Sequence, residues 1–534
     1  MRLRQPDREV VKMFLLMAVL LSMAITGGGA APNPFENGAA FTPENKIDEL
    51  VSAKLQELNL QPANVCPDAV FIRRVYLDAI GTLPTALEAQ QFILDRNPDK
   101  RRVLIDRLLA RDEFADYWAM KWSDLLRIKA EFPINLWPNA AQGYHHWIRE
   151  CLRENLPYDR FVREMLTASG SDFDVPPVNF YRALPGKDPP TIARTVALTF
   201  MGTRIETWPK EQQPELAAFF SNVGYKATSE WKEEIVFFNP AATNADAVGG
   251  APRLATFPDG TTVLLQPDED PRAVFADWLT NPKNPWFARN IVNRVWFWLL
   301  GRGIIQEPDD IRPDNPPGNP ELLAYLEQQL TSSGYDLKHI YRLILNSKTY
   351  QLASIPRTGN PQAAAQFAFY PLRRLDAEVL IDAVDQITGS TESYSSAIPE
   401  PYTFIPPGQR SIALPDGSIT SSFLEMFGRP PRDTGLESER NNRITAAQKL
   451  WLLNSSVMRQ KIEQSRMIQY QTESKKTPRE IAVGMYLGIL SRFPTAAESE
   501  TVETYFQSGK LGRREAAVDL AWALMNSDEF LYRH

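Results

Sequence analysis

Apolar residues recur at helical spacing along most of the chain, and pairs of prolines separate these periodic segments. Apolar side chains three or four residues apart form one face of an α-helix, whereas prolines interrupt the helical hydrogen bonding. Clear periodic segments are 101–110, 320–330 and 372–387, and the breaks include 176–177, 189–190, 316–317, 399–407 and 430–431. This alternation predicts a mainly α, multi-helical protein with proline-rich loops.

One stretch departs from the helical pattern. Residues 234–238 and 254–265 are rich in β-branched and aromatic side chains, and Asp259-Gly260 is a typical hairpin turn. We therefore expect a small β-ribbon inserted between two helical domains. The predicted division is a signal peptide at 1–31, a helical domain at 42–225, a β-ribbon or linker at 226–270 and a helical domain at 271–534.

The two ends of the chain share an internal repeat. Residues 76–85 match residues 486–495 without a gap, and each copy continues to an Asp-Glu-Phe sequence, at 112–114 and 528–530. In each copy a Pro-Thr turn joins two helices, and a glutamate three residues after the threonine completes a capping box. Two copies are too few for a solenoid. The repeat predicts two related helical hairpins that can pack together.

The N-terminus has the pattern of an export signal. Four basic side chains precede an apolar run of 13 residues, Met13 to Ile25, and small residues follow at 26–31. The run is short for a membrane span, although an uncleaved anchor is the alternative. No later segment is apolar for long enough to predict a membrane span. We expect a bacterial protein that is periplasmic or secreted, with no stable membrane span after signal removal.

Charge and residue counts exclude several functional classes. The formal net charge is −7, which argues against a nucleic-acid partner. Only two cysteines and four histidines occur in 534 residues, so we expect neither a metal site nor a cofactor. Export would allow Cys66 and Cys151 to form a disulfide, and the alternative is two separate buried thiols. Sequence spacing leaves both open.

The histidines are few and scattered: His145, His146, His339 and His534. His145 and His146 are adjacent, so on a helix they point in different directions and are poorly placed to hold one metal ion. Non-covalent haem binding would need a His or Met axial ligand, and His145, His146 and His339 are the interior histidine candidates. We regard haem binding as the weakest interpretation.

Segment 284–320 has the densest set of candidate functional residues. Its carboxylates Glu307, Asp309 and Asp310 can form a catalytic cluster or a calcium site. They can equally pair with basic side chains in a structural network, which we favour because arginines in an apolar helix need partners. The other members of this predicted binding or structural polar network are Arg289, Asn293, Arg294, Arg302 and Arg312.

Two further groups invite a similar choice. Residues 373–378 read Arg-Arg-Leu-Asp-Ala-Glu, which we interpret as a helix start with local charge pairs rather than a site. Trp137 and Trp208 lie near prolines and can form a sugar-stacking surface, although core or loop packing is the commoner role of such residues.

Several long phrases resemble two domains that occur together. Residues 71–84 and 99–109 resemble the domain of unknown function 1549. The phrases that resemble its usual partner, the domain of unknown function 1553, are 284–289, 301–305, 309–312, 315–317, 334–339, 346–351, 373–378 and 427–430. The resemblance covers nearly all of the chain after the signal. It implies an exported protein of the planctomycete cytochrome-associated type, to which no biochemical activity is firmly assigned.

The chain departs from this family at two motifs. Relatives typically carry Cys-x-x-Cys-His after the phrase that matches 200–204, and Cys-x-Cys before the one that matches Glu439-Arg440. Here those places read Ile-Glu-Thr-Trp-Pro at 205–209, and Leu436 with Ser438. Haem or metal ligation needs the thiols and the imidazole, so the chain is expected to lack the site of its relatives. The joint loss suggests that both motifs serve one site in relatives.

These features favour a non-catalytic, exported helical scaffold or binding protein whose partners are other exported proteins or glycans. The alternative is a hydrolase of extracellular polymers that uses Glu307, Asp309 or Asp310. Glycosidases need two carboxylates about 5–10 Å apart in a cleft. If core arginines satisfy Asp309 and Asp310, the alternative loses its best residues.

Overall fold

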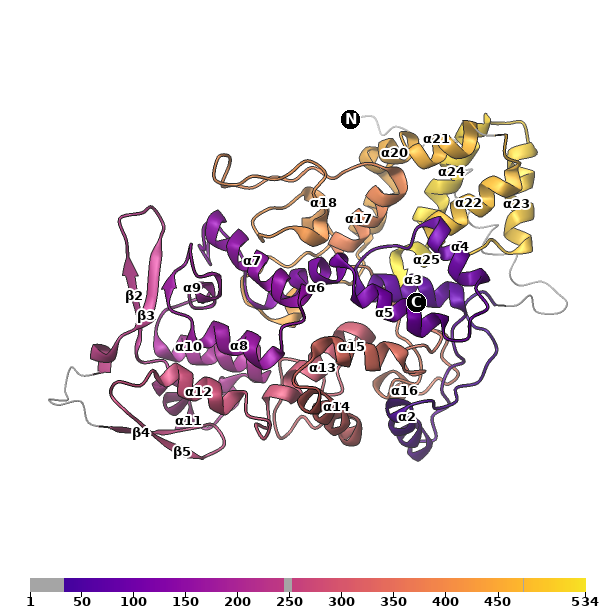
Figure 1. The fold of residues 1–534 in the computed structure, drawn as a ribbon. Coiled ribbons are helices and arrows are strands. Elements are labelled where there is room, and N and C mark those ends of the chain that lie inside the picture. The colour runs from indigo at the N-terminus through magenta and orange to yellow at the C-terminus, as the bar shows by residue number, and fades with distance from the viewer. Residues whose placement is uncertain (1–32, 244–251, 474) are drawn as a thin grey trace, which may run out of the picture.

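The computed structural model describes residues 33–243, 252–473 and 475–534, so the predicted signal peptide lies outside the described residues. Helices dominate the structure, as predicted (Figure 1). The helices of the first half are α2 (Lys46–Glu57), α3 (Asp68–Ala79), α4 (Ala86–Leu94), α5 (Lys100–Leu109), α6 (Asp112–Leu125), α7 (Pro138–Arg153), α8 (Tyr158–Thr167), α9 (Asn179–Arg182), α10 (Pro189–Val196) and α11 (Gln212–Ala218).

The second half continues in the same style. Its helices are α12 (Pro271–Leu279), α13 (Phe287–Leu300), α14 (Pro320–Ser332), α15 (Leu337–Asn346), α16 (Gln362–Ala365), α17 (Ala377–Thr388), α18 (Ser422–Met426), α19 (Ala446–Asn454), α20 (Ser456–Glu463), α21 (Arg466–Glu473), α22 (Pro478–Leu490), α23 (Ala496–Gln507), α24 (Arg513–Met525) and α25 (Asp528–Leu531). None of the described helices is both long and apolar enough to cross a bilayer.

Short antiparallel strand pairs interrupt the helices. The strands are β1 (Gly170–Ser171), β2 (Val223–Ala227), β3 (Glu234–Phe238), β4 (Arg253–Thr256), β5 (Thr262–Leu265), β6 (Arg373–Arg374) and β7 (Tyr532–Arg533). β3 pairs with both β2 and β1, and β4 pairs with β5 around the predicted Asp259-Gly260 turn. The small β insertion is therefore confirmed, and β2 extends it to a hairpin that projects at one side of the molecule (Figure 1).

One continuous hydrophobic core joins the first and second halves of the chain. Trp118 on α6 is almost fully buried between side chains of the second half. Its ring centroid lies 5.2 Å from that of Trp298 on α13 and 4.5 Å from that of Tyr341 on α15. Buried aromatic pairs add to the stability that apolar burial supplies. The packing of α6 thus depends on helices that lie much later in the chain.

The two repeat copies pack against each other. The hairpins α3–α4 and α22–α23 lie side by side in Figure 1. Thr85 and Thr495 both form the predicted capping boxes, with Glu88 and Glu498. On α3, the buried guanidinium of Arg73 donates to the carbonyl oxygen of Ile489 at 2.9 Å and to that of Phe530 at 2.9 Å. The expected contact between the chain ends is thereby confirmed.

In each repeat copy one arginine pairs with two equivalent glutamates, an arrangement that we call the clamp. The arginine stands at a different position in each copy. In the first copy Arg111 pairs with Glu88 and Glu113, and in the second Arg492 pairs with Glu498 and Glu529. Each guanidinium also lies over the equivalent tyrosine ring, Tyr76 or Tyr486. Aligned with the first copy, position 492 is Thr82, whereas position 111 aligns with Ser527. The two copies therefore share the same arrangement of charges, although the arginine occupies non-equivalent positions in them.

Exchanging these positions tests the clamp. Arg492→Thr is expected to lower the free energy of unfolding by about 1–2 kcal/mol, because two partly buried carboxylates lose their partner. Adding Ser527→Arg to that variant rebuilds the arrangement of the first copy and is expected to recover part of the loss. The measurement is urea unfolding of both single variants and the double variant, read as a double-mutant cycle. If the effects of Arg492→Thr and Ser527→Arg on the free energy of unfolding are strictly additive, the two positions do not serve the same pair of glutamates.

One predicted helix begins later than its periodicity suggests. The pattern at 372–387 predicts a helix over that whole range, but α17 begins at Ala377. The preceding residues Arg373 and Arg374 form β6 and pair with Arg533 and Tyr532 of β7. A strand contributed by a distant segment has overridden the local helical pattern.

Candidate functional site

Arg294 and Asp309 form a buried ion pair in the centre of segment 284–320. Arg294 lies on α13 and Asp309 in the loop that follows, and their side chains are 1% and 2% exposed. The Asp309 Oδ1 accepts from Arg294 Nη2 at 2.8 Å, and its Oδ2 accepts from the Glu437 backbone amide at 2.7 Å. Burial alone would lower the pKa of Arg294, but the carboxylates of Asp309 and Glu437 raise it. Both Asp309 oxygens are therefore occupied.

Of the remaining residues predicted for this network, one is buried and holds the loop, and the others lie near the surface. Asn293 fixes the same loop, because its side chain exchanges two hydrogen bonds with the backbone of Ile305. The others lie nearer the surface: Arg289 pairs with Glu327, Arg312 pairs with Asp310 and Asp314, Arg302 is half-buried, and Glu307 is exposed. The structure thus separates the three candidate carboxylates instead of presenting them as one cluster.

A larger buried charge network, which was not predicted as a unit, lies between the two halves of the chain. Arg440 is its hub. Its guanidinium donates to Asp124 of α6 at 2.6 Å and to Glu378 of α17 at 2.7 Å, and lies 3.6 Å from Asp376. Burial opposes the charge of Arg440, but these three carboxylates raise its pKa well above the usual value. One cation therefore joins its own segment to α6 and to the start of α17.

Asp376 is the second junction of this network. It lies just before α17, is completely buried, and pairs with Lys121 Nζ at 3.1 Å and Arg533 Nη2 at 2.9 Å. Asn442 and Tyr117 also donate to it, at 2.6 and 3.2 Å. Burial would raise the pKa of this carboxyl, but the surrounding cations hold it well below the usual value. The carboxylate therefore stays ionised in the core.

Asp78 extends the network to α3. Its Oδ2 accepts from the hydroxyls of Tyr350 at 2.9 Å and Tyr370 at 2.7 Å. Its Oδ1 lies 3.3 Å from Arg373 and 3.4 Å from Arg533. Because Arg533 contacts both Asp78 and Asp376, the described C-terminal strand links α3 to α17.

The prediction of local charge pairs at 373–378 was wrong. Asp376 and Glu378 instead form hydrogen bonds with side chains 62 to 259 positions away, of which Arg533 lies 157 away. The useful signal was the density of charges among apolar residues, since buried charges need partners. Sequence spacing could not identify those partners, because the fold brings them from other segments.

Gly202, three residues before the first segment that replaces a cysteine motif of relatives, and Glu437, within the second, both contact one loop. Gly202 accepts from the Ile311 amide at 2.8 Å, just before the segment 205–209. On the other side, Glu437 donates to Asp309 of the same loop. The two places are therefore brought together around residues 309–311 in this chain. Whether the motifs serve one site in relatives stays a prediction.

The two cysteines are free thiols in the structure. Cys66 is buried ahead of α3, and Cys151 is half-buried on α7. Burial raises the pKa of the Cys151 thiol to about 12, which keeps it protonated and unreactive. The structure thus corresponds to the alternative of two separate thiols rather than to the Cys66–Cys151 disulfide. Among the described residues, no group of three or more His, Cys, Asp or Glu side chains is arranged to hold a metal ion.

The histidines do not converge on one place. His145 is buried and His146 exposed, as their adjacency on α7 predicts, and His339 contacts Gln329 at 3.1 Å. Burial, assisted by neighbouring cations, lowers the pKa of His145 to about 3. His145 is therefore neutral at physiological pH.

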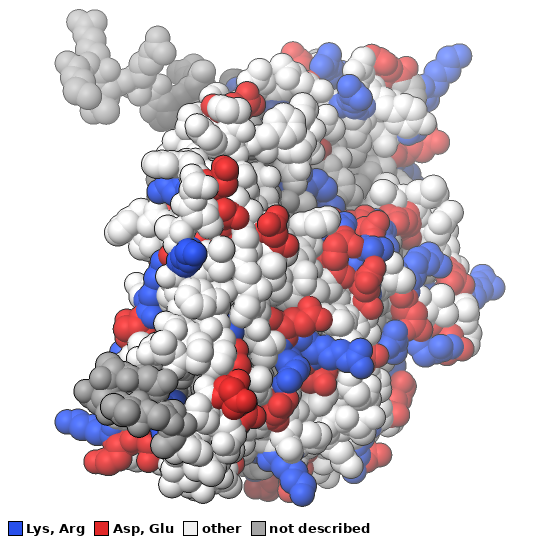
Figure 2. Space-filling model, turned by 60° about the vertical axis from the view of Figure 1, so that its left-hand side comes forward, with Lys and Arg blue, Asp and Glu red and all other residues white. Residues whose placement is uncertain are grey.

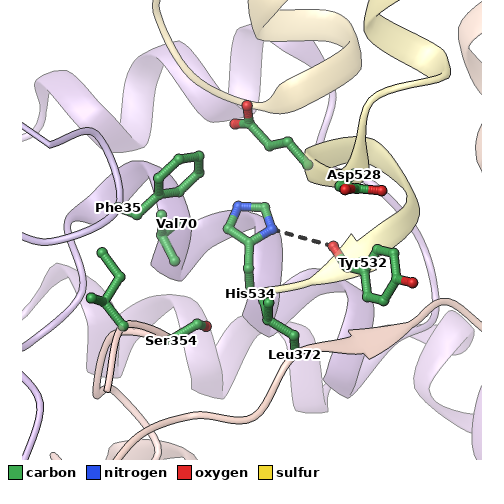
Figure 3. A pocket seen from close by; sticks show the side chains of 9 residues that line it. Phe35, Val70, Ser354, Leu372, Asp528, Tyr532 and His534 are labelled. Carbon is green, nitrogen blue, oxygen red and sulfur yellow. Dashed lines mark hydrogen bonds between the residues drawn. The ribbon is translucent and has the colours of Figure 1, made fainter. Parts of the chain in front are cut away.

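A cavity of about 450 Å³ lies beside β7. Its lining includes Phe35, Val70, Leu372, Asp528 and His534 (Figure 3). The His534 ring packs edge-on to Phe35 at 5.3 Å, and burial lowers its pKa to about 3. None of the predicted catalytic residues lines this cavity.

The two tryptophans singled out for sugar stacking contact different rings. Trp208 packs near Trp286, and its Nε1 donates to Thr203 at 3.0 Å, so it belongs to the packed interior of its loop. Trp137 lies 5.2 Å from Tyr402, which is 52% exposed. Only Trp137 remains available for a surface role.

Two family models match the chain. PSCyt2, described as a protein of unknown function (DUF1549), matches residues 46–223. PSD1, described as a protein of unknown function (DUF1553), matches residues 271–506. The two domains suggested by the sequence phrases are thus both present, in the expected order. No curated protein and no solved structure shows a significant match.

Proposed function

Because the chain belongs to the proteins that join a PSCyt2 domain to a PSD1 domain, both of unknown function, we propose that it is a non-catalytic, exported scaffold or binding protein. The export signal pattern at 1–31 supports a periplasmic or secreted location. Fusing this segment to a reporter that is active only outside the cytoplasm tests the location. An inactive, cytoplasmic reporter would count against export.

The observation that carries the non-catalytic assignment is the full occupation of Asp309. A general acid or base must reach substrate, but both oxygens of this carboxylate are bonded inside the protein. Its neighbour Asp310 pairs with Arg312, and Glu307 is exposed. These contacts count against the hydrolase alternative, because glycoside hydrolysis needs two carboxylates that face a cleft.

Hydrolysis assays test this assignment directly. The full chain, Asp309→Asn and Glu307→Gln are each incubated with soluble extracellular polysaccharides, and new reducing ends are measured. We expect no release above the buffer level from any of them, and lower stability for Asp309→Asn because Arg294 loses one of its two charged partners. Release by the native chain that disappears in folded Glu307→Gln would overturn the proposal.

A further inference from the structure

Three exposed aromatic side chains and the half-buried Trp137 form a shelf beside the β2–β3 hairpin. We call Trp137, Trp231, Tyr402 and Phe404 the aromatic shelf. Trp231, Tyr402 and Phe404 are 70%, 52% and 62% exposed. The ring of Trp137 lies 5.2 Å from that of Tyr402, and Lys232 lies over both tryptophans, 5.6 Å from Trp137 and 5.3 Å from Trp231. Contacts thus link Trp231, Trp137 and Tyr402 across three separate chain segments, and Phe404 lies two residues after Tyr402.

The backbone at Trp137 is held in a conformation that side chains rarely adopt. Its φ is 71°, and it is the residue immediately before α7. Such conformations cost about 1–3 kcal/mol and persist where the surrounding structure enforces them, commonly at ligand sites. The strain fixes the direction in which the indole leaves the backbone and so places it beside Tyr402.

A cavity of about 310 Å³ adjoins the shelf. Phe404 belongs to both, and α7 contributes Gln142, His145 and His146 to the cavity wall while Gln409 adds a second amide. The Nε2 of buried His145 has no hydrogen-bond partner among the described residues. An unpaired buried polar atom is costly, and a ligand hydroxyl or a water molecule would relieve that cost. The cavity therefore combines apolar walls with polar groups that can accept or donate.

Charged side chains of both signs are spread over this side of the molecule. Figure 2 brings the hairpin side forward and shows an area at the upper left with fewer Lys, Arg, Asp or Glu side chains than the rest of this face. The whole chain carries a formal charge of −7. A polyanionic ligand would be repelled by this net charge, so the surroundings favour a neutral one.

We propose that the aromatic shelf and the adjoining cavity bind a neutral glycan chain. Sugar rings present apolar C–H faces and polar edges, which match exposed aromatic rings beside amide and imidazole groups. Successive sugar units lie on Trp231, Trp137 and Tyr402, and the unit next to Phe404 reaches the cavity, where its hydroxyls meet Gln142 and Gln409. This inference rests on the proposed binding function and names its ligand class and its site.

The test is affinity electrophoresis of the full chain in gels that contain a soluble β-glucan, a mannan or an arabinoxylan. We expect at least one of these neutral polysaccharides to retard the native protein. Trp137→Ala and Tyr402→Ala are each expected to weaken that binding at least tenfold. Tyr402 lies in an exposed loop, so its variant remains informative if Trp137→Ala fails to fold.

Tyr470→Ala provides the matched control. Tyr470 is 67% exposed and lies under Lys476 at 4.4 Å, like Trp137 under Lys232, but it is on α21. Its replacement should leave binding unchanged. The inference fails if none of the neutral polysaccharides is bound, if only a polyanionic polysaccharide such as alginate is bound, or if the shelf variants bind as well as the native chain. Reducing-end release in the same samples would sink the non-catalytic function separately.

Discussion

Replacing Arg440 by methionine is expected to lower the free energy of unfolding by about 3–5 kcal/mol, the usual cost of breaking a buried ion pair from one side. Arg440 contacts Asp124, Glu378 and Asp376, which are 11%, 0% and 0% exposed. Methionine keeps much of the side-chain volume but removes the shared cation. The three carboxylates then face one another with fewer positive partners, and burial prevents water from replacing the lost bonds.

Chemical denaturation of the native protein and the variant measures this effect. Arg459→Met is the matched control, because Arg459 pairs with Glu463 on the surface of α20 with 76% of its side chain exposed. Its loss should cost less than about 1 kcal/mol. If Arg440→Met costs no more than the control, the hub contributes little and the network does not hold the two halves together.

The second large effect is a dependence of stability on pH that arises from Asp382. This carboxyl is buried on α17, where it accepts from the amides of Ser411 at 2.7 Å and Ile412 at 3.2 Å. Burial raises its pKa to about 6, despite Arg410 and these amides. Because the pKa of Asp382 is higher in the folded than in the unfolded protein, its protonated form favours the folded state. This contribution to the free energy of unfolding is fully present below about pH 4 and is lost as the pH rises through about 6.

Asp382→Asn isolates this contribution. The free energy of unfolding of the native chain, relative to that of the variant, should fall by about 2 kcal/mol between about pH 4 and about pH 7.5. Other titrating groups cancel in this difference because both proteins carry them. Unfolding curves at several pH values supply the measurement. A difference that stays constant across this range would show that Asp382 keeps an ordinary pKa.

Local patterns in the sequence identified much of the fold. The capping boxes at Thr85 and Thr495 and the turn at Asp259-Gly260 formed as predicted, because their determinants lie within a few residues of one another. β6 was missed because its partner strand β7 comes from the other end of the chain. Local propensity cannot reveal such a pairing.

In the candidate site, too, features that depend on neighbouring residues were predicted, whereas features that depend on distant residues were not. Segment 284–320 was singled out correctly as a place where buried arginines need partners, and Arg294 with Asp309 met that expectation. The hub at Arg440 was not predicted, since its partners Asp124 and Glu378 lie 316 and 62 residues away. The aromatic shelf was anticipated only at Trp137. Its other members become neighbours through the fold alone.

The contacts of α3 have a consequence for how the chain reaches its native state. Arg74 on this early helix donates to the carbonyl oxygen of His534, 460 residues away, while Asp78 on the same helix meets Arg533. Folding slows when native contacts join distant positions, because long loops must close before those contacts stabilise anything. A ribosome therefore completes α3 long before its acceptors exist. These contacts of α3 can therefore form only after Arg533 and His534 have been synthesised.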